Sequence, residues 1–217
     1  MSGLTLVIGN KNYSSWSLRA WLAMKQAGLD FTEVRIRLAT PATRREILLY
    51  SPAGKVPVLI DGAVTVWESL AICEYLAELC PAARLWPEDP AARALARAIS
   101  AEMHAGFERL RLHMPMNCRA RLPGKGRAPG VEDDIDRLTA IWRHCRQRFG
   151  GGGELLFGRF TIADAMYAPV VARFVTYEVR LDPVAKAYVE AVWGLSALRE
   201  WVATAEAEPE RIESEEL

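Results

Sequence analysis

The chain has 217 residues, 51% of them hydrophobic, which is enough for one large domain or two small ones with a real core. Its 27 basic residues balance its 27 acidic residues, and this argues against nucleic acid as the main partner because phosphate binding needs a basic excess. No apolar run approaches the ~20 residues that span a bilayer, and no basic segment with a cleavage site opens the chain, so we expect a cytoplasmic protein without a membrane partner.

The first eighty residues alternate between strand and helix patterns. A buried strand is predicted at 4–9 (LTLVIG), followed by a helix from Trp16 to Ala27 with Gly28 just past its end. Residues Thr32 to Leu38 alternate between apolar and polar with period two, which predicts a strand exposed on one side.

A short basic helix is predicted from Pro41 to Leu49, and two strands at 56–60 (VPVLI) and 63–67 (AVTVW) follow it. Asp61-Gly62 between these strands is a strong hairpin signal. A helix from Ser69 to Leu79 completes the order β-α-β-α-β-β-α. The first part of this order requires a parallel crossover, and the last part requires an antiparallel hairpin.

The remaining chain is helical. Residues 81–91 are rich in proline and cannot continue a helix, so they are the natural linker between residues 1–80 and residues 92–217. Helical patterns are predicted at Arg93–Arg121 with a break at Met114-Pro115, and at Glu132–Phe149, Thr161–Val179, Pro183–Trp193 and Leu195–Ala205. The fold class is therefore an α/β domain followed by an all-α domain.

The cysteines and histidines predict neither a disulfide nor a metal site. The four cysteines contain no C-x-x-C pair, so in a reducing compartment we expect free and mostly packed thiols. The three histidines share no ligand spacing with acids or cysteines, and we expect no metal.

Three motifs, taken in order and spacing, resemble those of the cytosolic glutathione transferase superfamily. Residues 14–17 (SSWS) are similar to the serine motif S-S-C-S-W-R of zeta-class members. Val56-Pro57 followed by Glu68-Ser69 is the second motif, and residues 161–164 (TIAD) are the third. The resemblance covers nearly the whole chain and is nearest to zeta-like bacterial members. It implies the glutathione transferase fold, with a thioredoxin-like glutathione-binding domain at 1–80 and an all-helical domain at 92–217 that contributes the electrophile pocket.

The resemblance implies a site for glutathione as co-substrate. A cis bond before Pro57 would let the backbone of Val56 pair with the cysteinyl part of glutathione like an added strand. We expect Ser69 to cap the following helix and, with the positive helix end, to hold the γ-glutamyl carboxylate, while Glu68 holds the ammonium group. Lys55 either reaches the glycyl carboxylate or is a solvated surface group.

The resemblance places the family's catalytic serine on Ser14. A hydroxyl at a helix N-terminus can donate to the glutathione thiolate, which lowers the pKa of the thiol. Ser15, Tyr13 and Ser17 offer hydroxyls in the same segment and stay open as alternatives.

Trp16 stands where zeta-class members have cysteine, and this puts the zeta activity, maleylacetoacetate isomerisation, in doubt. Thioredoxin-like redox chemistry is equally unexpected at a segment without a cysteine. Arg19 is interpreted as a helix-face arginine, solvated or paired within the fold.

Apolar residues of 102–119 predict the wall of the electrophile pocket, although any single one of them can equally belong to the core. The expected pocket residues are Trp16, Met103, His104, Phe107 and Met114, with Met116 beside them. Residues Thr161 to Asp164 form a capping box, which we expect to support folding and not to touch substrate.

These expectations combine into an enzyme, a detoxifying glutathione S-transferase that adds the thiolate to a small hydrophobic electrophile. The resemblance also implies a homodimer. The alternatives are a glutathione-dependent isomerase, a peroxidase, and a binding protein of the same fold without catalysis.

Overall fold

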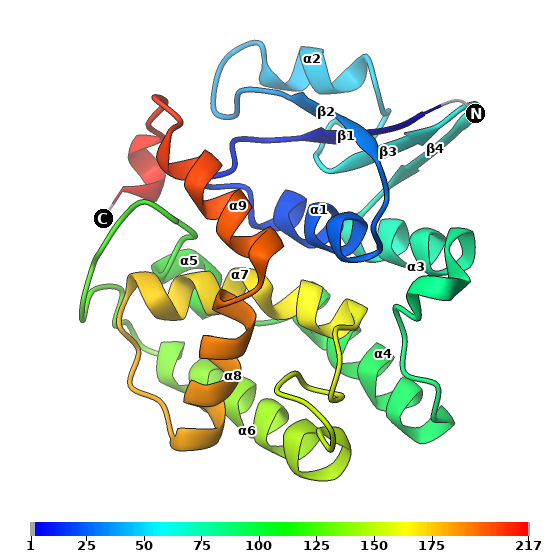
Figure 1. Ribbon diagram of the computed structural model, residues 1–217. Helices are drawn as coiled ribbons and strands as arrows, with labels where there is room; N and C mark the ends of the chain where they lie inside the picture. The colour runs from blue at the N-terminus through cyan, green and yellow to red at the C-terminus, as the bar shows by residue number, and fades with distance from the viewer. Residues whose placement is uncertain (1–2, 217) are drawn as a thin grey trace.

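The alternating strands and helices of the first eighty residues fold into a four-stranded sheet with helices on both faces (Figure 1). The computed structural model describes residues 3–216. The strand order is β2-β1-β3-β4, in which β1 and β2 are parallel and the other pairs antiparallel, so the predicted crossover and hairpin are confirmed. The strands are β1 (Leu4–Ile8), β2 (Phe31–Arg35), β3 (Val58–Asp61) and β4 (Val64–Trp67).

The hairpin turn lies one residue later than expected. Asp61 pairs with Val64, so Gly62 and Ala63 form the two-residue turn, and Gly62 supplies the positive φ of 56° that such a turn requires.

Side chains of β1 alternate between the two faces of the sheet. Leu6 and Ile8 face the large core under α1 (Ser15–Gln26) and α3 (Ser69–Leu79). Val7 faces a small second core beside α2 (Thr43–Leu48). Because α1 packs against α3 as well as the central helix of the second half, its residues are buried from Ser17 to Met24.

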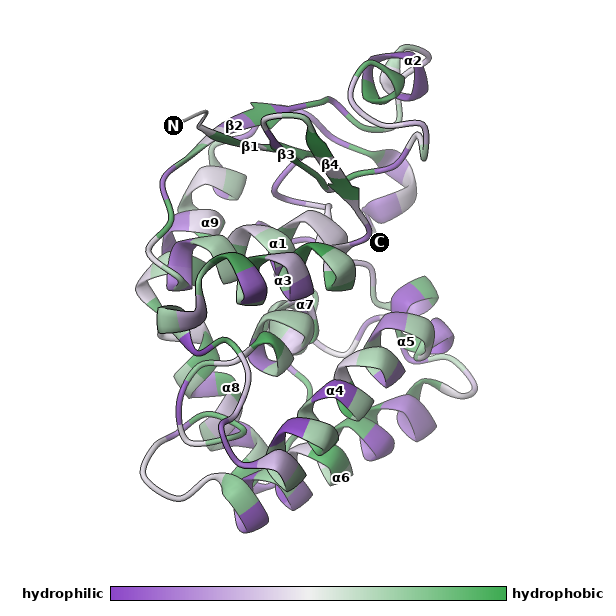
Figure 2. Ribbon diagram, turned by 90° about the vertical axis from the view of Figure 1, so that its right-hand side faces the viewer, coloured by the Kyte–Doolittle hydropathy of each residue, from purple (hydrophilic) through white to green (hydrophobic). Residues whose placement is uncertain are grey.

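The second half is a bundle built around α7, which is buried along almost its whole length. Figure 2 shows hydrophilic and hydrophobic residues alternating along α4 and α6, which lie at the outside. No helix among residues 3–216 has the length and apolarity that crossing a membrane requires. The helices are α4 (Pro90–Ala105), α5 (Glu108–His113), α6 (Val131–Phe149), α7 (Ile162–Thr176), α8 (Pro183–Trp193) and α9 (Ser196–Glu206), with 3-10 turns η1 (Pro81–Ala83) and η2 (Glu213–Glu215).

The helix predicted to run unbroken to Met114 ends nine residues earlier, at Ala105. Phe107 adopts a left-handed conformation with φ of 63°, which no continuous helix accommodates. The Arg111 guanidinium donates to the carbonyls of Met103, His104 and Gly106 and so satisfies acceptors that the end of α4 leaves open. The interruption predicted at Met114-Pro115 coincides with the end of the separate short helix α5, whose C-cap is Met114.

The predicted capping box at the start of α7 is present, and its acid is fully buried. The Asp164 carboxylate accepts from the Thr161 N–H at 2.8 Å and from the Thr161 hydroxyl at 3.0 Å. The Leu156 N–H and the Tyr188 hydroxyl, each at 3.2 Å, donate to its other oxygen. Asp164 therefore fastens α7 to α8 and to the turn before α7.

This burial predicts a pH-dependent stability. Burial raises the pKa of the Asp164 carboxyl from 3.8 to about 6, although its hydrogen bonds act in the opposite direction. Between these values the folded chain binds the proton more tightly than the unfolded chain, so the contribution of Asp164 to stability falls as the pH rises from about 4 to about 6. The free energy of unfolding of the wild type minus that of Asp164→Asn should therefore decrease across this window, by up to about 3 kcal/mol. Denaturant unfolding at several pH values measures it, and a constant difference would contradict the prediction.

Candidate functional site

The carboxyl-terminal end of β4, the turn before β3 and the end of α4 enclose a first cavity of about 340 Å³. It brings together all five residues predicted to bind glutathione. The Val56–Pro57 bond in its wall is cis, as expected. The lining residues are Trp16, Ala53, Lys55, Val56, Pro57, Trp67, Glu68, Ser69 and His104.

Glu68 and Ser69 form the polar end of this cavity. Glu68 joins β4 to α3 in a conformation with φ of 70°, which is uncommon for a residue with a side chain. Ser69 was expected to cap α3, but Glu68 is at the N-cap position and Ser69 is the first helical residue. The Ser69 hydroxyl is buried and has no hydrogen-bond partner among residues 3–216. The hydroxyl therefore does not cap the helix and is available to form a hydrogen bond with a ligand.

His104 of α4 lies in the first cavity beside Glu68, and not in a separate electrophile pocket. Its Nε2 is 3.4 Å from a Glu68 carboxylate oxygen, and its ring packs edge-on against Trp16 with 5.1 Å between ring centres. Burial and the nearby Arg19 lower the pKa of His104 below 6.5, so the ring is neutral at pH 7. Its partly exposed ring is thus an uncharged contact between the two halves of the chain.

A second cavity of about 460 Å³ shares Trp16, Lys55 and Val56 with the first. The serines at the start of α1 form one side of it, and two arginines of the helical half form another. Its lining residues are Tyr13, Ser14, Ser15, Trp16, Leu38, Thr43, Ile47, Gly54, Lys55, Val56, Arg111, Met116, Arg173 and Glu215.

Ser14 is the N-cap residue of α1. Its hydroxyl donates to the Ser17 Oγ at 2.7 Å, and that oxygen also accepts from the Gly9 N–H at 3.1 Å. Ser15, the first helical residue, also lines the cavity, and its hydroxyl has no hydrogen-bond partner within residues 3–216. Both serines therefore face the same space, but only the Ser14 hydroxyl belongs to an internal network.

The Tyr13 hydroxyl is occupied by the carboxyl-terminal tail. It lies 2.5 Å from a Glu216 carboxylate oxygen, and it also accepts from Arg119 at 2.9 Å and from the Ile212 N–H at 3.3 Å. Burial, followed by the bond to Glu216, raises the pKa of Tyr13. These contacts make Tyr13 a poor donor to a ligand, which leaves the serines as the better candidates.

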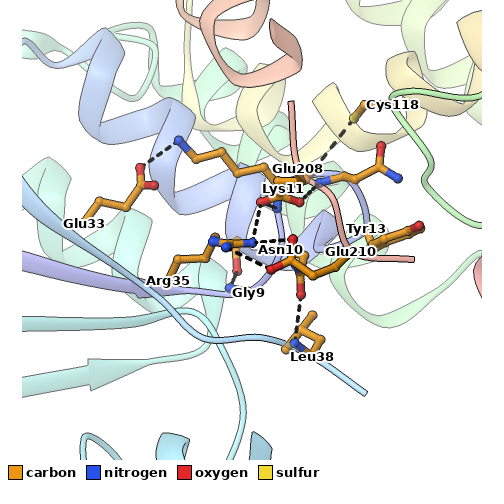
Figure 3. Close-up of polar contacts among 12 residues, drawn as sticks. Gly9, Asn10, Lys11, Tyr13, Glu33, Arg35, Leu38, Cys118, Glu208 and Glu210 are labelled. Carbon is orange, nitrogen blue, oxygen red and sulfur yellow. Dashed lines mark hydrogen bonds and ion pairs between the residues drawn. The ribbon is translucent and has the colours of Figure 1, made fainter. Parts of the chain in front are cut away.

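The tail reaches this region because acidic residues after α9 bind the loop that follows β1 (Figure 3). The Glu208 carboxylate accepts from the backbone N–H groups of Lys11 at 2.8 Å and Asn12 at 3.2 Å. Arg35 of β2 forms ion pairs with Glu208 at 3.3 Å and Glu210 at 3.0 Å. The tail therefore holds the segment that leads into the serines.

Three residues expected in the electrophile pocket belong to the core instead. Met103, Phe107 and Met114 are 1%, 7% and 0% exposed, belong to the large core and line neither cavity. Of the apolar residues in this region, Met116 lines the second cavity.

Arg19 was expected to be solvated or paired, but it is 1% exposed and two of its guanidinium nitrogens have no partner among the described residues. Its guanidinium carbon is 4.3 Å from the centre of the Trp16 ring, and that of Arg111 is 4.6 Å from the same centre. Trp16, which lines both cavities, is therefore held by two cations.

Sequence reasoning missed Arg111, Arg173 and Glu215. A signal existed for Arg173, since it is the one basic residue in the otherwise apolar α7. No group of His, Cys, Asp or Glu within residues 3–216 has the geometry to hold a metal ion.

Comparisons with known proteins match both halves of the chain. A family model for the glutathione S-transferase N-terminal domain matches residues 13–79, and one for the glutathione S-transferase C-terminal domain matches residues 128–204. Maleylacetoacetate isomerase of Rattus norvegicus is 30% identical over 78% of this chain and 77% of its own. The isomerase of Mus musculus is 38% identical over the same shares, 78% and 77%.

Solved structures give the same result. A glutathione transferase homologue from Burkholderia, crystallised with glutathione, superposes with a TM-score of 0.71 at 26% identity and covers 95% of this chain and 100% of its own. A theta-class glutathione S-transferase from Xanthomonas axonopodis pv. citri, also with glutathione bound, gives a TM-score of 0.67 at 26% identity, with coverage of 95% and 100%.

Proposed function

This chain belongs to the glutathione S-transferase family, and from that premise we propose that it binds glutathione across the two cavities and holds the thiolate beside Ser14. Glutathione is its co-substrate, and the reaction is glutathione-dependent. The observation that carries the proposal is the first cavity, which the cis Val56–Pro57 turn lines together with Glu68 and a Ser69 hydroxyl that has no partner among residues 3–216.

The charges of the two cavities suit the ends of glutathione. The γ-glutamyl end carries an ammonium group, which fits the half-exposed Glu68 carboxylate, and a carboxylate, which fits Ser69 and the positive end of α3. Lys55 lines both cavities and suits the glycyl carboxylate. Val56 offers its backbone to the cysteinyl part between these ends.

The thiol then lies next to the start of α1. Ser14 donates to the thiolate once its hydroxyl turns from Ser17 toward the second cavity, and the positive end of α1 adds to the effect. Ser15 stays the alternative because its hydroxyl needs no such rearrangement. Both routes lower the pKa of the glutathione thiol and raise the population of the nucleophile.

Isomerisation of maleylacetoacetate is the second candidate, because two relatives with that name cover most of this chain. Trp16 stands where the zeta-class motif has cysteine, and its bulky ring lines both cavities, which puts isomerisation in doubt and favours conjugation. Assaying both reactions with one preparation decides between them. The homodimer stays a prediction from the family, and the division at residues 81–91 and the cytoplasmic location stay predictions from the sequence.

Ser69→Ala tests the binding half of the proposal. Since Ser69 would donate to a charged carboxylate, we expect its loss to weaken glutathione binding about tenfold, measured by isothermal titration calorimetry. Ser100→Ala is the matched control, because Ser100 is also buried without a partner among residues 3–216 but lines neither cavity. Equal affinity for both variants and the wild type would reject this glutathione site.

A further inference from the structure

The wall of the second cavity opposite the serines carries two fixed positive charges. The Arg111 guanidinium is held by three carbonyls at the end of α4. The Arg173 guanidinium donates to the carbonyls of Met114 at 2.7 Å and Pro169 at 3.1 Å. These bonds use two nitrogens of each guanidinium. The Nη1 of Arg111 and the Nη2 of Arg173 have no partner among residues 3–216.

No carboxylate within the described part of the chain forms an ion pair with either arginine. Asp134 acts on Arg111 from a distance, and its Oδ2 already accepts from the Leu110 N–H at 2.9 Å. Burial and the charge of Arg111 lower the pKa of Arg173 to about 10. Arg173 is 5% exposed and Arg111 is half-buried, and Arg19 adds a further buried charge next to the Trp16 ring. A buried charge without a counter-ion is costly, and an anionic ligand at these arginines would compensate that cost.

We propose that Arg111 and Arg173 bind a carboxylate group of the second substrate, which is therefore an anion and not a purely apolar electrophile. This inference rests on the proposed function, since it assigns the part of the second cavity that glutathione leaves free. The two carboxylates of glutathione are accounted for by Ser69 and Lys55. A third carboxylate at the arginines would come from the molecule that the thiolate attacks.

Glu215 sets the strength of this site. It comes from η2 in the tail, lines the same cavity, and is too far from Arg173 to form an ion pair. Burial raises the pKa of Glu215, while Arg173 lowers it. When ionised it repels an arriving anion, so its neutral replacement strengthens anion binding.

The test compares an acid with its uncharged analogue. Calorimetric titrations use 3-nitrobenzoate and 3-nitrobenzamide, which do not react, with S-methylglutathione present in excess. We expect the wild type to bind the acid about tenfold more tightly than the amide, as for hydrogen bonds to a charged group. Arg111→Gln and Arg173→Gln should reduce this ratio to about one.

Arg121→Gln is the matched control, since Arg121 also donates to backbone carbonyls, those of Cys118 and Ala120, but lines neither cavity. It should keep the preference for the acid. Glu215→Gln should bind the acid several times more tightly and leave the amide unchanged.

Three results would overturn the inference. One is a wild type that binds the acid no better than the amide, or binds neither. Another is a preference for the acid that persists in folded Arg111→Gln and Arg173→Gln. If both arginine variants unfold, unchanged acid binding by Glu215→Gln overturns it. Titration of S-methylglutathione alone separates the two proposals, because failure there rejects the glutathione site itself.

Discussion

Replacement of Asp164 by alanine is expected to lower the free energy of unfolding by about 3–5 kcal/mol. Within residues 3–216, the Asp164 carboxylate is the only acceptor for the Thr161 N–H, the Leu156 N–H and the Tyr188 hydroxyl, and the change removes it. Each buried donor left without a partner costs about 1–3 kcal/mol, and the helix cap is lost as well. Urea unfolding followed by circular dichroism at pH 7 measures the change.

Asp182→Ala is the control for a solvent-exposed helix cap, and it also removes the exposed ion pair of Asp182 with Arg143 at 2.6 Å. Asp182 caps α8 through the N–H groups of Val184 at 2.9 Å and Ala185 at 3.1 Å, but its side chain is 31% exposed. Water can replace those bonds, so we expect a loss of about 1 kcal/mol. If Asp164→Ala cost no more than Asp182→Ala, the buried network would not be the source of the effect.

Ser14→Ala should reduce kcat/KM for conjugation by about 10- to 100-fold, the effect of removing one donor to a charged group. The bound thiol should titrate at a higher pKa, because the thiolate loses its hydrogen bond. Thiolate absorbance near 240 nm, followed against pH in the binary complex, reports that pKa directly. Glutathione affinity should change little, since Ser14 contacts neither end of the molecule.

Variants of the two neighbouring serines, Ser15 and Ser17, are the controls for this experiment. Ser15→Ala should leave the thiol pKa near the wild-type value, whereas a large rise there would transfer the role to Ser15. Ser17→Ala should raise the thiol pKa by less than Ser14→Ala does and by more than Ser15→Ala does. Ser17 accepts from Ser14 at 2.7 Å before glutathione binds, and it can donate back to Ser14 once that hydroxyl turns to the thiolate. A full loss in Ser17→Ala would indicate that Ser17 is more than a support.

The features predicted correctly from the sequence depend on short stretches of chain. The hairpin near Asp61-Gly62 and the capping box at Thr161–Asp164 are determined by a few neighbouring residues, and the structure contains both, with the hairpin turn one residue later, at Gly62 and Ala63. The grouping of the proposed glutathione-binding residues around one cavity was predictable for a similar reason, because the turn at Val56-Pro57 and the start of α3 are local motifs.

The features that were missed depend on contacts between distant segments. The helix break at Gly106 is stabilised by Arg111, whose bonding the local pattern does not reveal. Arg19 has the spacing of an exposed residue on an amphipathic helix, but α1 is covered on the side where solvent was expected. The second cavity combines α1, α5, α7 and the tail, so no single stretch could predict it.

The bond between Glu208 and the backbone of Lys11 spans 197 residues and has a consequence for the order of events during synthesis. At about 5–20 residues per second, a ribosome needs roughly 10–40 seconds to make the chain between these two positions. Throughout that time the loop before Ser14 lacks the carboxylate that fixes its N–H groups. The sheet and its helices can form before Glu208 is made, but the segment before Ser14 reaches its final arrangement only after Glu208 has been made. Ordering of this segment is therefore a later step than formation of the sheet.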